Sequence, residues 1–145
     1  MSVTVRTVRD EAELEAARDL RVRVFCGEQG VDASEELDEL DEVAAQIVAL
    51  DESGVIATCR VRETDRGLWK LERMVVEKRL RGSGVGARLL TGAEAEARER
   101  GASEMVLHAQ RRAESFYAGN GYVPEGDTFL EAEIEHVRMR KSLDA

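Results

Sequence analysis

The sequence feature that most constrains the fold is a glycine-rich turn, Arg81-Gly82-Ser83-Gly84-Val85-Gly86, between two apolar segments. The run Met74-Val75-Val76 before the turn is typical of a buried strand. After the turn, an apolar stripe recurs with the helical period until Gly101, which predicts a helix over residues 85–100. Its members are Val85, Leu89, Ala93 and Ala97. A strand and a helix connected in this way share one hydrophobic core, with the helix covering a sheet.

The other periodic segments predict an α+β fold, a mixed sheet with helices on its faces. Strands are expected around residues 3–8, 46–50, 55–62, 68–76 and 104–109, with one or two more within 129–142. Helices are expected after Asp10, whose spacing to Glu13 resembles a capping box, and at residues 112–118. Residues 26–44 are acidic and irregular, which predicts a loop or a short surface helix.

Length and composition indicate one domain over residues 1–145. The chain is 43% hydrophobic with a single proline and no low-complexity tract, which excludes a disordered or collagen-like protein. No apolar run approaches the roughly 18 residues of a membrane span, and the first residues lack the apolar segment of a signal peptide. We therefore expect a soluble cytoplasmic protein without a membrane partner.

The charge balance is strongly acidic. Thirty Asp and Glu residues oppose twenty-one Lys and Arg residues, a formal net charge of −9 at pH 7. A nucleic-acid partner is not expected, because binding to its phosphate backbone depends on Lys and Arg side chains that displace counterions, and an acidic protein is repelled. The scarcity of lysine suits a saline, halophilic cytoplasm or a GC-rich genome. We interpret the surface as a solvated acidic one, with a field that attracts cationic substrates as the alternative.

Cysteine and histidine spacing gives no support to a metal site. Cys26 and Cys59 have neither metal-ligand nor disulfide-framework spacing and are predicted to be reduced thiols. His108 and His136 lie far apart, without an HxxxH or CxxC pattern. No metal is therefore expected.

The glycine-rich turn has the composition of an anion site. Successive N–H groups and the positive end of the following helix favour an anion there. Gly84 and Gly86 lack side chains that would hold a phosphate away from the backbone, and Arg81 adds a positive charge. No Gly-Lys-Ser/Thr follows, which excludes a P-loop, and Ala87 stands where a dinucleotide-binding loop has its third glycine. The alternative is a strand-to-helix connection without a ligand.

Two motifs together resemble the GNAT (Gcn5-related N-acetyltransferase) superfamily. Arg81-x-x-Gly84-x-Gly86, after a strand ending Val75-Val76, is similar to its acetyl-CoA pyrophosphate loop. Gln110-x-x-Ala113-x-x-x-Tyr117, followed by Gly121-Tyr122, resembles its second motif, with Gln in place of Asn and Tyr in place of Phe. Other segments resemble the ElaA/YjcF-like branch, which has a His where this chain has Gln46. They are Phe25 with Glu28-Gln29, Glu36-Leu37-Asp38-x-x-Asp41, Leu107-His108-Ala109-Gln110 and His136-x-x-Met139.

The resemblance implies a GNAT-like single domain whose mostly antiparallel, twisted sheet is flanked by about four helices. A central splay between two strands would admit the pantetheine arm of acetyl-CoA, the implied co-substrate, along a strand edge. The residues implied to bind it are Met74, Val75 and Val76, the turn residues Arg81, Gly82, Ser83, Gly84, Val85 and Gly86, and Gln110 and Tyr117.

The implied reaction is the direct attack of a neutral amine on the thioester. An alkyl ammonium, with a pKa near roughly 10.4, must lose a proton, and the departing thiolate needs one. Tyr117 is implied as the general acid, with an aromatic core pair with Phe116 as the alternative. Glu72 is the candidate base; the alternative is an ion pair with neighbouring arginines, Arg60, Arg62 or Arg73.

The acceptor end of the site is less defined. His108 and His136 are candidates for a proton relay, or are hydrogen-bonded core residues. Asp38 and Asp41 could share a helical face and bind an ammonium group, although a solvated acidic loop is the simpler account. The implied partners are acetyl-CoA and an amine of a small molecule or peptide, with a homodimer as one assembly. The alternatives are a non-catalytic acyl-CoA-binding regulatory module and an acidic protein-interaction subunit.

Overall fold

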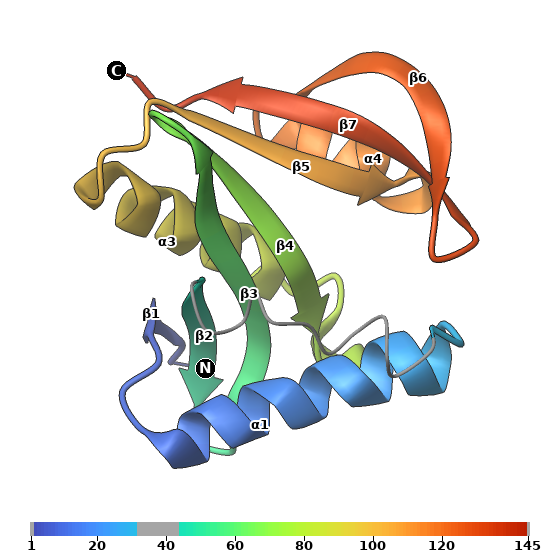
Figure 1. Cartoon of the computed structure of the whole chain (residues 1–145). Helices are drawn as coiled ribbons and strands as arrows, with labels where there is room; N and C mark the ends of the chain where they lie inside the picture. The colour runs from blue at the N-terminus through green and yellow to red at the C-terminus, as the bar shows by residue number, and fades with distance from the viewer. Residues whose placement is uncertain (1, 32–43, 145) are drawn as a thin grey trace.

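The computed structural model describes residues 2–31 and 44–144 of the 145-residue chain. Their strands form one seven-stranded sheet in the order β1-β2-β3-β4-β5-β7-β6 (Figure 1). The strands are β1 (Thr4–Thr7), β2 (Ala45–Asp51), β3 (Gly54–Asp65), β4 (Leu68–Val76), β5 (Glu104–Gln110), β6 (Val123–Glu131) and β7 (Ile134–Ser142). The predicted α+β fold with a mostly antiparallel sheet is confirmed.

Three α-helices lie within the described residues: α1 (Glu11–Arg21), α3 (Val85–Glu99) and α4 (Glu114–Gly119). A π-helix, η1 (Val22–Glu28), continues α1, and the 3₁₀ turns η3 (Lys78–Leu80) and η4 (Arg111–Ala113) precede α3 and α4. The family resemblance implies about four helices, and residues 26–44 are expected to form a loop or a short surface helix. Residues 26–28 of that segment belong to η1, and residues 32–43 lie outside the described part. No described helix is long and apolar enough to cross a membrane.

The start of α1 follows the predicted capping pattern with one change. The Asp10 carboxylate accepts a hydrogen bond from the Glu13 N–H at 2.9 Å. Glu13 reaches back to the N–H of Arg9, also at 2.9 Å, instead of that of Asp10. It also pairs with Arg6 of β1 at 2.6 Å, which ties the helix to the sheet.

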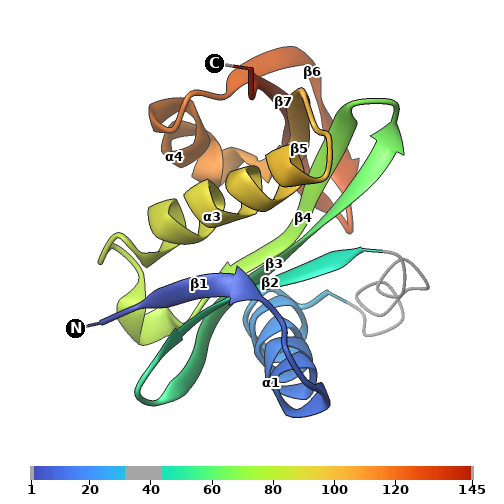
Figure 2. The same cartoon turned by 90° about the vertical axis from the view of Figure 1, so that its left-hand side faces the viewer.

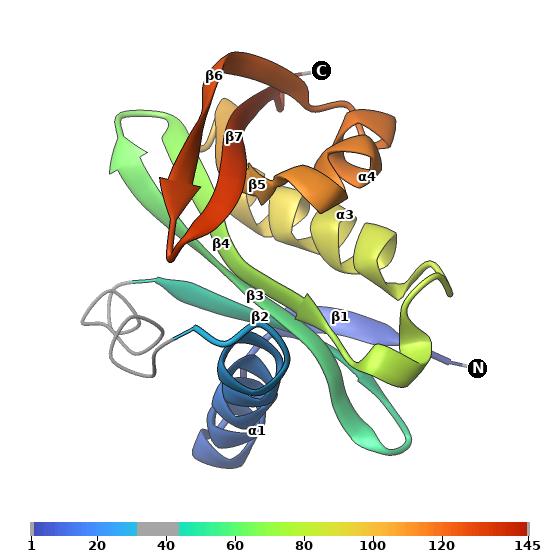
Figure 3. The same cartoon turned by 90° about the vertical axis from the view of Figure 1, so that its right-hand side faces the viewer.

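The sheet splays between β4 and β5, its one parallel pair among the described strands. These strands are paired only from Leu68 opposite Glu104 to Leu71 opposite Leu107. Beyond that point β4 continues to Val76 and β5 to Gln110 along diverging paths (Figure 1, Figure 3). The central splay expected from the family resemblance is therefore present.

A β-bulge in β4 accompanies the splay. Thr58 of β3 lies opposite Val75, and Arg60 lies opposite Glu72, so two residues of β4 face one residue of β3. Arg73, within the bulge, has a φ of 55°. An extra residue of this kind bends the bulged strand and increases its twist, and here the bend falls where β4 leaves β5.

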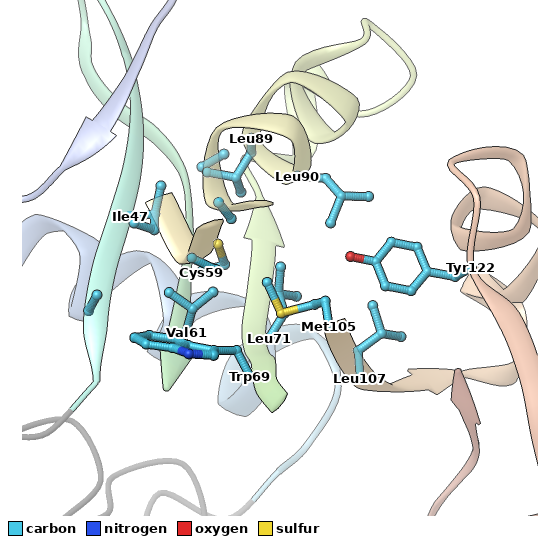
Figure 4. Close-up of a cluster of buried hydrophobic side chains, with 14 of the residues drawn as sticks. Ile47, Cys59, Val61, Trp69, Leu71, Leu89, Leu90, Met105, Leu107 and Tyr122 are labelled. Carbon is cyan, nitrogen blue, oxygen red and sulfur yellow. The ribbon is translucent and has the colours of Figure 1, made fainter. Parts of the chain in front are cut away.

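Helices α1 and α3 cover opposite faces of the sheet (Figure 2, Figure 3). The main core lies under α3, where Leu89 belongs to one buried cluster with Val61 of β3 (Figure 4). A smaller cluster of Leu20, Val24 and Val75 joins α1 and η1 to β4. Buried clusters thus pack against both faces of β4 next to the splay.

The C-terminal hairpin is longer than the sequence predicts. β6 begins at Val123, whereas the prediction started at residue 129. As the edge strand of the sheet, β6 leaves Val123 65% and Leu130 74% exposed, so its residues lack a clear alternation of buried and polar positions. At the other edge, β1 ends at Thr7, and Val8 follows it.

Candidate functional site

A pocket of about 850 Å³ opens where β4 and β5 diverge. Its volume falls within the roughly 300–1,000 Å³ of small-molecule sites. The walls come from η1, β4, the glycine-rich turn, β5, α4 and the β6–β7 hairpin. Of the predicted site residues, all but Ser83 and Val85 line it. Val85 is buried in the main core, and the Ser83 hydroxyl donates to the Leu80 carbonyl.

The glycine-rich turn forms one end of the pocket and requires glycine for its backbone. Gly82 and Gly84 have φ values of 82° and 92°, in the left-handed region that side chains disfavour. Gly84 is the N-cap of α3, so the first-turn amides next to it have no intrahelical acceptor. A Cβ at Gly86 would lie 3.4 Å from the Phe116 ring and 3.5 Å from Met74 Cε, which would narrow the pocket.

Arg81 stands at this end but shares its charge with a carboxylate. Its guanidinium donates to Glu28 of η1 at 2.8 Å and to the Val76 carbonyl at 3.1 Å. The hydrogen bond from Arg81 lowers the pKa of Glu28 more than desolvation raises it. Glu28 is therefore an ionised residue of the pocket wall, and its only signal in the sequence is the Phe25 with Glu28-Gln29 segment.

Gln110 is held in place by two polar contacts. Its amide nitrogen donates to Gln29, the residue after η1, at 2.7 Å, and its carbonyl oxygen accepts from Arg112 at 3.0 Å. Since Gln110 ends β5 and Gln29 follows η1, the contact between them bridges the two sides of the splay.

The edge of β4 over residues 74–76 borders the pocket. On one side this segment pairs with β3 through Val75 and Val76. On the other side, its pairing with β5 ended at Leu71, so no described strand covers that edge. Its backbone groups can therefore bond an extended ligand in the pocket.

Tyr117 projects from α4 into the middle of the pocket wall. Its hydroxyl donates to Met74 Sδ at 3.5 Å, and its ring lies edge-on to Phe116, with centroids 5.1 Å apart. Burial, with a smaller contribution from the Cys59 thiol, raises the pKa of Tyr117 well above its usual value. The hydroxyl thus keeps its proton at neutral pH and lies beside a sulfur atom. Tyr117 thus both forms the expected aromatic pair with Phe116 and lines the pocket.

Glu72 is surrounded by cations. It accepts from Arg62 and lies 3.4 Å from Arg60, which is fully buried, and 3.7 Å from Lys70. Desolvation raises the pKa of Glu72, but the hydrogen bond from Arg62 and the charges of Arg60 and Lys70 outweigh it, so the pKa is lowered. These contacts match the ion-pair alternative, and a carboxylate with a lowered pKa is a weak base.

The hairpin brings a carboxylate to the two candidate histidines. His108 Nδ1 lies 3.0 Å from one carboxylate oxygen of Glu131, and His136 Nε2 lies 3.6 Å from the other. All three residues line the pocket at the end away from the glycine-rich turn. Glu131 has no signal in the sequence, because only the register of β6 against β7 shows that it shares a face with His136.

Other sequence candidates lie apart from the pocket or outside the described residues. Asp38 and Asp41 fall in the segment that is not described. Cys59 is buried, and desolvation raises the pKa of its thiol. Gln46, which replaces the histidine of the resembled branch, is buried in β2. Within residues 2–31 and 44–144, no group of three or more His, Cys, Asp or Glu side chains is arranged to hold a metal ion.

Comparison with known proteins identifies the family to which this fold and pocket belong. The family model of the acetyltransferase (GNAT) domain matches residues 11–143. The chain belongs to the GNAT acetyltransferase family. It is 40% identical over 134 residues to the uncharacterized N-acetyltransferase YjcF of Bacillus subtilis, a match that covers 92% of this chain and 95% of that protein.

Solved structures agree with this assignment. A candidate N-acetyltransferase from Lactobacillus plantarum superposes with a TM-score of 0.91 at 29% identity, over 99% of both chains. Escherichia coli ElaA shares the fold, with a TM-score of 0.80 at 21% identity, over 97% of this chain and 100% of ElaA. The chain is thus a GNAT domain of the ElaA/YjcF-like branch, as its motifs predict.

Proposed function

We propose that residues 1–145 form a single acetyl-CoA-dependent N-acetyltransferase domain that acts on an amine of a small molecule or peptide. The observation that carries the proposal is the pocket in the splay, with the glycine-capped start of α3 at one end and the Tyr117 hydroxyl in its wall. Membership of the acetyltransferase family supports the reaction class.

The pocket walls fit the two kinds of polar group in the coenzyme. The uncovered β4 edge over residues 74–76 suits the amides of the pantetheine arm, because a strand edge offers alternating donors and acceptors. The amides over residues 82–86, with Arg81, suit the pyrophosphate, because they combine N–H donors, the helix dipole and a guanidinium. Gln110, fixed by Gln29, orients the arm from the β5 side. When bound, acetyl-CoA supplies an acetyl group activated as a thioester.

In this proposal Tyr117 acts as the general acid. Its hydroxyl keeps a proton at neutral pH and donates it to the departing thiolate sulfur of CoA. In doing so it gives up its hydrogen bond to Met74 Sδ. Glu72 stays ionised among its cations and acts at most as a weak base. The proton of the acceptor ammonium therefore needs another group, which lies at the opposite end of the pocket.

Calorimetric titration with acetyl-CoA tests the proposal, run in dilute buffer and in molar KCl. We expect a dissociation constant near micromolar, or about −8 kcal/mol, and release of free CoA when an amine panel is added. Gly84→Asp should abolish binding, because it combines a strained left-handed residue with a carboxylate at the anion end.

Gly126→Asp provides the matched control. Gly126 has a φ of 78° and open space around it, and it does not line the pocket, so the same backbone strain is introduced elsewhere. Binding of acetyl-CoA by both Gly84→Asp and Gly126→Asp would contradict the proposal. So would the absence of acetyl-CoA binding by the wild type in both buffers. Binding without turnover on any amine would favour the non-catalytic acyl-CoA-binding module instead.

A further inference from the structure

Glu131 holds His108 in one tautomer. A carboxylate oxygen can only accept, so the 3.0 Å contact with His108 Nδ1 places a proton on Nδ1. The other ring nitrogen, Nε2, then carries the lone pair and is the basic atom. The hydrogen bond from His108 lowers the pKa of Glu131 more than partial burial raises it, so the carboxylate is ionised at neutral pH. The pair combines an oriented imidazole with a fixed negative charge.

His136 is held on the other side of the same carboxylate. Its Nδ1 lies 2.6 Å from the Ile134 carbonyl and therefore donates to it, which leaves Nε2 as the basic nitrogen. That Nε2 faces the second Glu131 oxygen at 3.6 Å. His136 is buried, whereas the Glu131 side chain is 45% exposed and reaches solvent. A proton on either imidazole is thus stabilised by the same carboxylate.

The hairpin is built to keep this arrangement. Phe129 lies edge-on to the His108 ring, with centroids 4.9 Å apart, and stacks on His136 at 6.0 Å. The two-residue turn after Glu131 has both Ala132 and Glu133 in the left-handed region, with φ values of 50° and 62°. Non-glycine residues adopt this conformation at a cost in free energy. Two positive φ angles are the geometry of a type I′ hairpin turn, which sets the register of β6 against β7 and makes Glu131 the last residue of β6.

The charges around the cluster favour its role as a base. Lys70 and Glu72 of β4 line the pocket beside it, and Arg138 of β7, opposite His108, is paired with Glu125. Lys70 helps to keep Glu131 ionised. Glu72 is engaged by its own cations, and the basic Nε2 of His136 faces Glu131. His108, whose Nδ1 and not Nε2 contacts Glu131, is therefore the base that we assign at this end.

We infer that His108 accepts the proton of the acceptor ammonium and that Glu131 is the positioning residue that orients it. In the step, an N–H bond of the ammonium breaks, its electron pair stays on nitrogen as the attacking lone pair, and the proton binds His108 Nε2. Glu131 stabilises the imidazolium, with His136 on its other oxygen. The inference rests on the proposed acetyltransferase function and adds its base.

The test compares the pH profiles of kcat/KM for the wild type, Glu131→Gln and His108→Gln, with acetyl-CoA and an active amine. We expect Glu131→Gln to lower kcat/KM roughly 10- to 100-fold and to move the acid limb to lower pH by roughly one unit, since the imidazolium loses its counter-charge. His108→Gln should remove that limb. Acetyl-CoA affinity should stay unchanged in both. Glu135→Gln, on the same hairpin but paired with Arg111 outside the pocket, should match the wild type.

Imidazole ¹⁵N spectra give a readout that is independent of turnover. The wild type should show His108 protonated at Nδ1, and Glu131→Gln should lose this tautomer preference. An unchanged pH profile in Glu131→Gln, or His108 protonated at Nε2 in the wild type, would overturn the inference while leaving the acetyltransferase proposal intact. No CoA release by the wild type with any amine would overturn the proposed function, and the inference with it.

Discussion

The buried Tyr117 hydroxyl donates a hydrogen bond to Met74 Sδ. Its proposed role as an acid can be tested by a substitution that removes only the hydroxyl oxygen. Tyr117→Phe keeps the ring contacts with Phe116 and Tyr122 but loses the proton donor. We expect kcat to fall about 10²- to 10⁴-fold, the usual contribution of a general acid, with little change in acetyl-CoA affinity. Steady-state kinetics and calorimetry measure the two quantities.

Tyr122→Phe is the matched control for that change. The Tyr122 hydroxyl donates to Glu94 of α3 at 2.8 Å, inside the core and away from the pocket. Its loss should reduce stability but leave kcat of the folded enzyme as it is. An equal loss of acetyl-CoA affinity and of kcat in Tyr117→Phe would make Tyr117 a binding residue instead of an acid.

Glu13 carries a prediction about pH. The hydrogen bond from Arg6, followed by that from the Arg9 N–H, lowers the pKa of Glu13 from 4.5 to about 2. The ionised carboxylate thus stabilises the folded state above pH 4.5, and this contribution is lost as the pH falls towards 2. Glu13→Gln should have a lower free energy of unfolding than the wild type at pH 7, with a difference that shrinks at pH 3. Urea denaturation at both values measures it, and Glu11→Gln, in the same helical turn, should show no comparable pH-dependent difference.

The sequence predicts individual site residues only where the signal lies within a few positions of the chain. Tyr117 and the glycines follow from a motif and from backbone geometry within a few positions. Glu72 was found from its strand, but its ion pairs depend on the register with β3, which contains a bulge. Glu131 depends on a hairpin whose start the exposed edge strand conceals. Long-range pairing therefore determines which side chains meet in the pocket, and local sequence patterns do not show it.

At the scale of elements, α3 approaches β1 so closely that any side chain at one helix position would overlap a side chain of β1. A Cβ at Gly92 would lie 2.4 Å from Val5 Cγ1. Alanine normally favours a helix by about 0.5–1 kcal/mol over glycine, yet here the overlap should dominate. We expect Gly92→Ala to lower the free energy of unfolding by about 1–3 kcal/mol, measured by chemical denaturation.

The double variant Gly92→Ala with Val5→Ala separates this contact from a general helix effect. Removing the Val5 methyls should relieve the overlap, so Gly92→Ala should cost less in the Val5→Ala background than in the wild type. A double-mutant cycle measures the coupling between the two sites. Additive effects, or a stabilising Gly92→Ala, would contradict the close approach.

Elements with strong local signals were predicted well, and those set by neighbours were not. The capping residue Asp10 and the stripe of α3 are local, and both helices begin where the sequence indicates. The π-helix η1 and the β4 bulge have no comparable signal, although both line the pocket. In each case the regular hydrogen-bond pattern gives way beside the splay, where the structure makes room for a ligand.

At the scale of the whole molecule, two electrostatic effects of opposite sign meet. The excess of Asp and Glu side chains gives a net charge of −9, and the repulsion among these carboxylates destabilises the folded state. Surface ion pairs such as Arg81 with Glu28 stabilise it, but exposed pairs contribute only about 0–1 kcal/mol each. Salt screens both effects. Because the uncompensated charge acts over the whole surface, we expect the repulsion to dominate the response to salt.

The thermal midpoint should therefore rise with KCl, most steeply between 0.01 and 0.2 M, where the screening length falls from about 30 Å to below about 10 Å. Each kcal/mol of relieved repulsion corresponds to roughly 2–8 °C for a domain of this size class. The double variant Glu15→Gln with Glu99→Gln removes two exposed charges and should melt at a higher temperature in low salt, with a shallower salt dependence. Differential scanning calorimetry across the KCl series measures both curves. A midpoint that falls with salt would mean that the ion pairs dominate, and a rise that begins only near molar KCl would indicate an adaptation to a saline interior that charge screening does not explain.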